Sequence, residues 1–516
     1  MNKTKQREVL ILILCVLIGL VLRIHTFDRR SLWVDEIYTL NDSRDGLKDQ
    51  LEYYRENPTY PHPPLFFVLT HFFYPFEKPE RDLRMIPLIF GILSLLMIYF
   101  VSRSFSHDIA LPCTLSLTFM TYHISLSQDA RPYSLLLFLS MSGLYFFMKY
   151  LKTSKKKHLI LVAFFFSALF HTSYSTIPFI LFSQVLWFYN PRETDRKPVL
   201  ASFITLNGLI LLFCLPWMFF IVYHFEGQSL GEYLRYAKEN IPLWSTAYWI
   251  FHDWASHALL MLLSILALIL FAFLSKNRTN AIVLLSMVLL PIGGVYLFCS
   301  LLNLSHFITS RYFISFLPIF FVSIYLAIHT IENRLKLFGG VCWLSILFLA
   351  IFMAANLNLL RLYYGSEKQD FRGVANYLKK EIQDGDSIIV LSVEYFPGIL
   401  HYLGVYPNGR HYRIPCRTVS ENELEYRLSL VIENRDFVIS CSKKYWLQYA
   451  LEGSRLWFVL NKTAAEKEKG NPSCILKGRF DGSFLNLNRF PTDASMYLFL
   501  WGPESQERRG IDVSVQ

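Results

Sequence analysis

The sequence has few charged residues and lacks the short motifs of nucleotide-binding and zinc-binding enzymes. Charged residues make up 17% of its 516 residues, whereas a soluble protein carries about 25%. The polar C-terminal part contains no glycine-rich phosphate loop, dinucleotide fingerprint or Cys/His zinc spacing. Internal repeats and low-complexity tracts are also missing. A soluble nucleotide-dependent enzyme is therefore not expected.

Cysteine is scarce, and its positions allow few disulfides. Five of the eight cysteines lie within apolar runs, where cysteine behaves as a small core residue. Cys416, Cys441 and Cys474 lie in the polar C-terminal part. Three cysteines there allow one disulfide with one residue left over, and the spacing does not identify the pair.

Long apolar runs dominate what is present. Hydrophobic residues make up 53% of the chain and aromatic residues 16%. The runs are separated by short basic links, which predicts a polytopic α-helical membrane protein of about 11–13 membrane helices. The first run has a basic start but no small-residue cleavage site, so we expect an uncleaved helix. The candidate spans are residues 9–27, 85–102, 109–126, 133–151, 158–171, 175–190, 199–225, 257–275, 281–301, 312–331 and 337–360.

The basic links predict the topology. Lysine and arginine fall on one side if these spans alternate, and the positive-inside rule makes that side, with the N-terminus, the cytoplasm of a bacterial inner membrane. The net charge of +10 therefore reflects topology rather than nucleic-acid binding. Residues 64–76 must then form an interfacial or re-entrant segment, since a crossing would invert every later link. The extracytoplasmic side receives Asp35, Glu36, His62, residues 128–133, a long loop at 226–256, and Arg311.

The chain changes character after residue 360. Residues 370–382 read as an amphipathic helix, and residues 387–393, 436–440, 456–460 and 496–501 as strands. We therefore divide the chain into a membrane core at 1–360, with a first extracytoplasmic loop at 28–63, and a soluble α/β domain at 361–516. Because the last span follows a cytoplasmic link, this domain is expected outside, where it shapes access of the acceptor.

A carboxylate pair follows the first apolar run. Asp35 and Glu36 either belong to a solvated loop or border a water-filled cavity, where such residues are functional candidates. The pair Pro63–Pro64 fixes the entry of the next apolar segment and places His62 at its mouth. This arrangement favours a catalytic vestibule.

Several stretches together resemble the GT-C superfamily of membrane glycosyltransferases. The likeness is to the branch of protein O-mannosyltransferases, lipid A aminoarabinose transferases and rhizobial lipopolysaccharide galacturonosyltransferases. The matching stretches, in order over about the first 330 residues, are 32–36 (LWVDE), 62–65 (HPPL), 84–87 (RMIP), 128–133 (QDARPY) and 311–313 (RYF); residues 370–373 (DFRG) with Gly385 and Asp386 resemble the tail of many bacterial members.

The resemblance implies transfer of one sugar from a polyprenyl-phosphate carrier to an acceptor hydroxyl, usually with inversion. The acceptor is an envelope lipid, glycan or protein, and the carrier and membrane lipids are the remaining partners. Such a reaction needs a carboxylate that takes the hydroxyl proton and cationic groups that neutralise the leaving phosphate. No nucleotide is required.

The matching positions suggest a role for each candidate residue. Asp35 matches the general base of the family, and Glu36 supports it, binds the acceptor or is simply water-exposed. Arg131 suits bidentate phosphate binding, unless it snorkels to lipid headgroups. Arg311 repeats this logic, while Asp129 could pair with Arg131. Tyr133 contacts the donor or, as we favour, belongs to an aromatic belt. His62 is most consistent with phosphate or headgroup contact.

Two further questions stay open at the level of sequence. A divalent cation is conceivable if Asp35, Glu36 and Asp129 converge, but no cofactor is expected to be required in this branch. The main alternative function is a lipid-linked-sugar transporter or flippase, which would show broken helices near mid-membrane and repeated halves. A non-catalytic scaffold is the third alternative, and it requires that the acidic vestibule be dispensable.

Overall fold

The computed structural model describes most of the chain and divides it into two compact units. The described residues are 3–56, 62–191, 200–224, 241–302, 308–335, 343–391, 395–405, 427–432, 435–440, 455–469, 471, 473–484 and 492–501. The first unit comprises residues 1–27, 45–363 and 486–489, and the second comprises residues 28–44, 364–485 and 490–516. The sequence placed residues 28–44 with the membrane core, whereas their contacts group them with the C-terminal domain.

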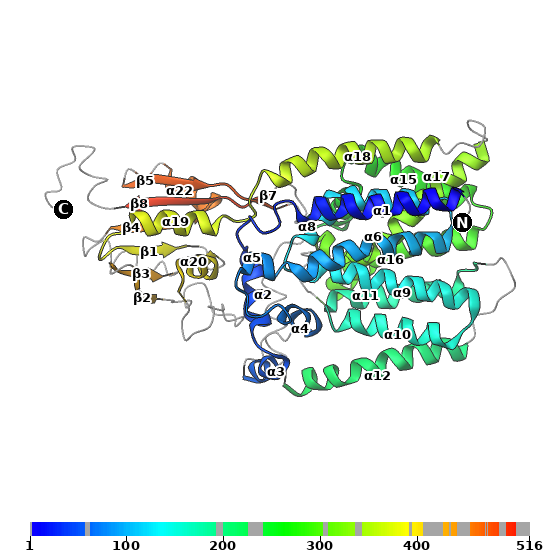
Figure 1. Ribbon diagram of the computed structural model, residues 1–516, viewed down its shortest axis with the longest axis horizontal. Helices are drawn as coiled ribbons and strands as arrows, with labels where there is room; N and C mark the ends of the chain where they lie inside the picture. The colour runs from blue at the N-terminus through cyan, green and yellow to red at the C-terminus, as the bar shows by residue number, and fades with distance from the viewer. Residues whose placement is uncertain are drawn as a thin grey trace. The chain divides into compact units, whose positions relative to one another are not determined.

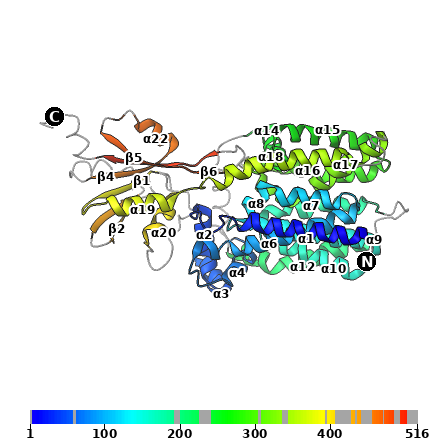
Figure 2. The same ribbon diagram turned by 45° about the horizontal axis from the view of Figure 1, so that its top comes forward.

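The first unit is a bundle of apolar helices (Figures 1 and 2). Within this bundle, α6 contacts α1 and α9, and α10 contacts α9 and α12. Its helices are α1 (Lys3–Ile24), α3 (Leu47–Glu56), α4 (Leu65–His71), α5 (Pro79–Asp82), α6 (Met85–Phe105), α7 (Ala110–Phe119), α8 (Thr121–Ser127), α9 (Tyr133–Thr153), α10 (Lys156–Phe170), η1 (Tyr174–Thr176), α11 (Ile177–Phe182), η2 (Ser183–Phe188), α12 (Leu200–His224), α14 (Leu243–Ala255), α15 (Ala258–Leu274), α16 (Arg278–Leu301), η3 (Ser310–Phe316), α17 (Leu317–Leu335) and α18 (Trp343–Tyr364).

Six helices in the described part of the chain are long and apolar enough to cross a membrane, or seven if the pair α14–α15, bent by 102°, counts as one span. The other predicted spans coincide with α1, which carries charged residues near both ends, and with shorter helices. The predicted span at 109–126 is broken at Met120, whose extended backbone separates α7 from α8. These elements belong to the same bundle, so the helical membrane architecture predicted from the apolar runs is confirmed, while its span number stays a prediction.

One part of the predicted extracytoplasmic loop is a helix. The sequence placed residues 226–256 in a long loop, but residues 243–255 form α14, with Ile250 and Trp254 fully buried. His252 and Asp253 interrupt the apolar pattern and hid this helix. Residues 225–240 lie outside the described part of the chain. Segment 64–76 contains the seven-residue α4, which is far too short to cross a hydrocarbon core of about 30 Å.

Contacts between helix ends bring the basic links together at the end of the bundle that holds the N-terminus. Arg103 Nη1 donates to Glu8 Oε1 at 3.2 Å, and Lys152 Nζ donates to the Ser104 carbonyl. His329 Nε2 lies 3.6 Å from Asp108 Oδ2. These contacts gather the ends of several helices at one end of the bundle, and the side of the membrane on which that end lies stays a prediction.

The second unit is built on a mixed six-stranded sheet with strand order β2-β3-β1-β4-β8-β5. Strand β1 pairs in parallel with β3 and β4, and the remaining pairs are antiparallel. The elements are α2 (Val34–Arg44), α19 (Phe371–Glu381), β1 (Ser387–Val390), α20 (Phe396–Leu403), β2 (Arg427–Ile432), β3 (Arg435–Ser440), β4 (Leu456–Asn461), α22 (Lys462–Glu468), β5 (Cys474–Phe480), β6 (Ser483–Phe484), β7 (Thr492–Asp493) and β8 (Met496–Trp501).

Alternation along the strands supplies a core on each face of this sheet. In β4, Trp457 and Val459 pack with the α19 and α20 side, whereas Leu456, Phe458 and Leu460 face α22. Such an alternation follows from the two-residue period of a strand. The C-terminal α/β fold predicted from the sequence is thus confirmed, while the domain boundary at residue 360 stays a prediction. Cys474 is a free thiol, and Cys416 and Cys441 lie outside the described residues.

Candidate active site

His62 and Arg131 come together in the first unit. His62 lies just before α4, and Arg131 lies in the turn between α8 and α9. Burial of the imidazole, aided by the positive charge of Arg131, lowers the pKa of His62 to about 3. His62 is therefore neutral at physiological pH. A neutral imidazole next to a permanent cation can donate one N–H to an anion without adding a second charge.

Arg311 and Tyr133 form a second contact in the same unit. The Arg311 guanidinium carbon lies 5.7 Å from the centre of the Tyr133 ring and 5.5 Å from that of Tyr312. Tyr133 is the first residue of α9 and is 4% exposed. Its ring is buried within the protein, so the interpretation of Tyr133 as part of a lipid-facing aromatic belt is wrong. A cation–π contact of this kind orients the guanidinium.

The turn that carries Asp129 and Arg131 is anchored to the end of α1. Gln128 Nε2 donates to the carbonyl oxygens of Arg23 and His25 at 2.9 and 2.6 Å. The Arg131 N–H donates to the Asp129 carbonyl at 2.6 Å, and Asp129 is buried. These bonds fix the backbone of the predicted motif at residues 128–133.

A hydrogen-bonded chain missed by the sequence analysis ends beside Arg311. The Tyr122 hydroxyl donates to Ser310 Oγ at 3.0 Å, and Ser310 Oγ donates to Asp253 Oδ2 at 2.5 Å. Asp253 is buried in α14. A carboxylate within an apolar run was the available signal, but residue 253 had been assigned to a loop.

Asp35 and Glu36 occupy the first turn of α2, in the second unit. Glu36 is 1% exposed, and its Oε2 accepts the Trp33 N–H at 3.3 Å. This is the returning half of a capping box, which supplies a partner for a helix-terminal N–H. Glu36 therefore caps the helix and is not a water-exposed carboxylate. Asp35 is partly exposed, and its carbonyl accepts from the Thr39 hydroxyl. Its approach to Arg131 stays a prediction.

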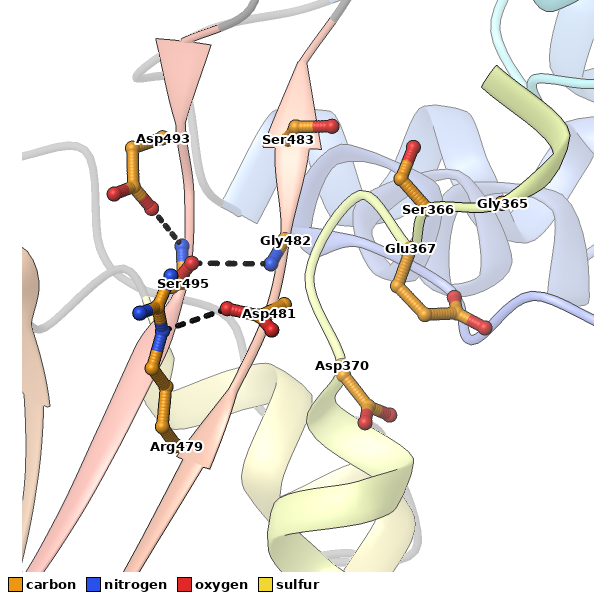
Figure 3. A pocket seen from close by; sticks show the side chains of 10 residues that line it. All are labelled: Gly365, Ser366, Glu367, Asp370, Arg479, Asp481, Gly482, Ser483, Asp493 and Ser495. Atoms are coloured by element: carbon orange, nitrogen blue, oxygen red, sulfur yellow. Dashed lines mark hydrogen bonds and ion pairs between the residues drawn. The ribbon is translucent and has the colours of Figure 1, made fainter. Parts of the chain in front are cut away.

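A polar cavity of about 510 Å³ lies within the second unit (Figure 3). Its acidic groups have partners within the fold. Asp481 pairs with Arg479 at 2.7 Å, Asp493 accepts the Ser495 N–H, and Asp370 caps α19. Among the described residues, no group of three or more His, Cys, Asp or Glu side chains is placed to hold a metal. That no cofactor is required stays a prediction.

The lowered pKa of His62 predicts a specific pH dependence of stability. Between about 3 and the ordinary value of 6.5, the unfolded chain binds more protons at this residue than the folded chain. The unfolding free energy therefore rises with pH through this window and levels off above it. Thermal unfolding of the detergent-solubilised protein from pH 4 to 7 should show a steeper rise for wild type than for His62→Asn. Parallel curves would contradict the assigned environment.

Comparisons with known proteins agree with this architecture. Residues 61–220 match the family described as dolichyl-phosphate-mannose-protein mannosyltransferase, whereas no curated protein matches the sequence. The chain is similar to apo ArnT from Cupriavidus metallidurans, with a TM-score of 0.58, 10% identity, and coverage of 97% of this chain and 98% of that one. ArnT from the same organism bound to undecaprenyl phosphate gives a TM-score of 0.53 and 11% identity over 95% and 97% of the two chains. At this identity the likeness establishes the fold.

Proposed function

We propose that this chain, which has the GT-C fold of membrane glycosyltransferases, transfers a single sugar from a polyprenyl-phosphate donor to an envelope lipid, glycan or protein. The observation that carries the proposal is the fold match over nearly the whole of both chains to a protein also crystallised with undecaprenyl phosphate. The family match at residues 61–220 adds support, because it includes His62, Asp129, Arg131 and Tyr133.

The residues present suit the chemistry of this reaction. The acceptor oxygen attacks the anomeric carbon, its proton passes to the Asp35 carboxylate, and the sugar–phosphate bond breaks with its electron pair leaving on phosphate. Attack from the face opposite the phosphate inverts the anomeric centre. Arg131 neutralises the phosphate, and neutral His62 donates to it. Arg311, oriented by Tyr133, provides a second cation for the leaving group or the sugar.

The charge of the links supports a proposal for the side of the membrane on which transfer takes place. The end of the bundle that holds the N-terminus also holds Arg103 and Lys152, and basic links favour the cytoplasm. At the opposite end of the bundle, just after α1 ends, the side chains of Arg84 and Gln128 donate hydrogen bonds to backbone carbonyl oxygens. We therefore assign the transfer to the extracytoplasmic side of the bacterial inner membrane.

A deletion strain tests this function and identifies the substrates. Mass spectrometry of its envelope glycans, lipids and proteins should show the loss of one sugar, accumulation of one polyprenyl-phosphate sugar, and restoration of both by the wild-type gene. The missing sugar defines donor and acceptor together. Purified protein in vesicles that moves labelled carrier lipid across the bilayer, with no sugar transfer to any extracted acceptor, would instead establish a flippase.

A further inference from the structure

The residues that precede Asp35 are held by side chains more than 330 positions later in the sequence. The Ser31 N–H donates to Glu367 Oε2 at 3.1 Å and the Val34 N–H donates to Gln369 Oε1 at 3.1 Å. The Leu32 N–H donates to the Tyr402 hydroxyl at 2.6 Å. All of these residues belong to the second unit.

These bonds complete the start of α2. The first N–H groups of a helix have no partner within it and need acceptors from elsewhere. Glu36 serves the Trp33 N–H from within the helix, but the Val34 N–H depends on Gln369. Gln369 accepts a second hydrogen bond, because its backbone carbonyl oxygen accepts from Ser31 Oγ. Its residue is 4% exposed, so water cannot readily replace it.

A packing contact reinforces the same segment. Lys368 Nζ lies 4.7 Å from the centre of the Trp33 ring, and both residues are buried. Arg372 Nη1 donates to the Arg29 carbonyl at 2.9 Å. These contacts hold residues 29–34, the segment of the chain that leads into Asp35.

We propose that Gln369 and Tyr402 are positioning residues that set the orientation of Asp35, so that the C-terminal domain takes part in catalysis by holding the base. This inference rests on the proposed function. The C-terminal residues take no part in the chemistry themselves, because they contact the backbone of residues 31–34. A shift of about 1 Å in a reacting group can lower a rate by about a hundredfold. The hydrogen bonds from the start of α2 to Gln369 and Tyr402, called the clamp from here on, are therefore expected to affect the rate strongly.

Gln369→Ala in the full-length protein tests the inference by two independent measurements. It should lower kcat by about tenfold or more and change the donor KM by less than about threefold, because the donor phosphate is bound by other residues. Hydrogen–deuterium exchange should become faster in peptides covering residues 31–36. Gln369→Glu keeps an oxygen acceptor for Val34 and should restore both. Gln383→Ala, the same change at an exposed position of the same unit, should alter neither.

Tyr402→Phe provides a second test that keeps the ring and removes the acceptor for Leu32, and it decides the matter if Gln369→Ala does not fold. Its matched control is Tyr377→Phe, whose ring packs near Trp457 and Phe480. Wild-type kcat or unchanged exchange in Gln369→Ala and Tyr402→Phe overturns the positioning role. Inactive wild-type protein overturns the proposed function instead, and a clamp confirmed by exchange would then be structural only.

Discussion

Asp35→Asn is expected to abolish sugar transfer, with a loss of about 10²–10⁴-fold, while the protein still inserts and accumulates. The amide has the shape of the carboxylate but cannot accept the acceptor proton at neutral pH. Asp35 lies in the first turn of α2 and keeps some solvent access, so the substitution should leave the folded core intact. Transfer is measured with purified protein and the donor identified from the deletion strain.

Two controls separate a base from a structural carboxylate. Asp49→Asn makes the same change at an exposed position in α3 and should leave transfer unchanged. Glu36→Gln keeps an oxygen that can accept the Trp33 N–H, so it should reduce transfer far less than Asp35→Asn. Full activity of purified Asp35→Asn protein would exclude Asp35 as the base, whatever the behaviour of the controls.

The sequence predicted those elements whose hydrophobic pattern is local. The apolar run at 133–151 corresponds to α9 (Tyr133–Thr153), and the strand predicted at 496–501 corresponds to β8. In both cases a continuous apolar run marks the element, because its side chains are buried along most of its length. The helix expected at 370–382 likewise appears as α19, capped by Asp370.

The elements that the sequence missed depend on polar residues inside apolar surroundings. Asp253 made α14 look like a loop, although its carboxylate accepts a hydrogen bond from Ser310. Met120 interrupts a run that reads as continuous, and the Thr121 N–H just after the break donates to Asn356 Oδ1. Partners that satisfy such groups lie far away in the chain, so no local window contains them.

In the candidate site, too, the sequence identified the residue types but missed the contacts between distant residues. The motifs at residues 32–36, 62–65 and 128–133 were visible as residue types, and the structure places His62 near Arg131. The clamp on the start of α2 was not visible, because Gln369 and Val34 are 335 positions apart. A single sequence gives residue chemistry at each position but no pairing between distant backbone and side-chain groups.

Arg131→Ala should weaken donor binding by about 10–100-fold, the effect of losing a hydrogen bond to a charged group, and Arg131→Lys should weaken it much less than Arg131→Ala. Lysine keeps the positive charge but loses the planar fork that grips two phosphate oxygens. Arg278→Ala changes an exposed arginine at the start of α16 and is the matched control. Titration with polyprenyl phosphate and the donor KM provide two measures of affinity.

His62 supplies an internal check on the Arg131 variants. Because the positive charge of Arg131 contributes to the low pKa of His62, its removal should raise that pKa, while burial keeps it below 6.5. The stability difference between pH 4 and 7 should therefore shrink in Arg131→Ala and remain near wild type in Arg131→Lys. If that difference shrinks while both variants keep wild-type donor affinity, the loop is intact and Arg131 is an interfacial residue. If donor affinity falls together with the pH effect, Arg131 and His62 share one anion site.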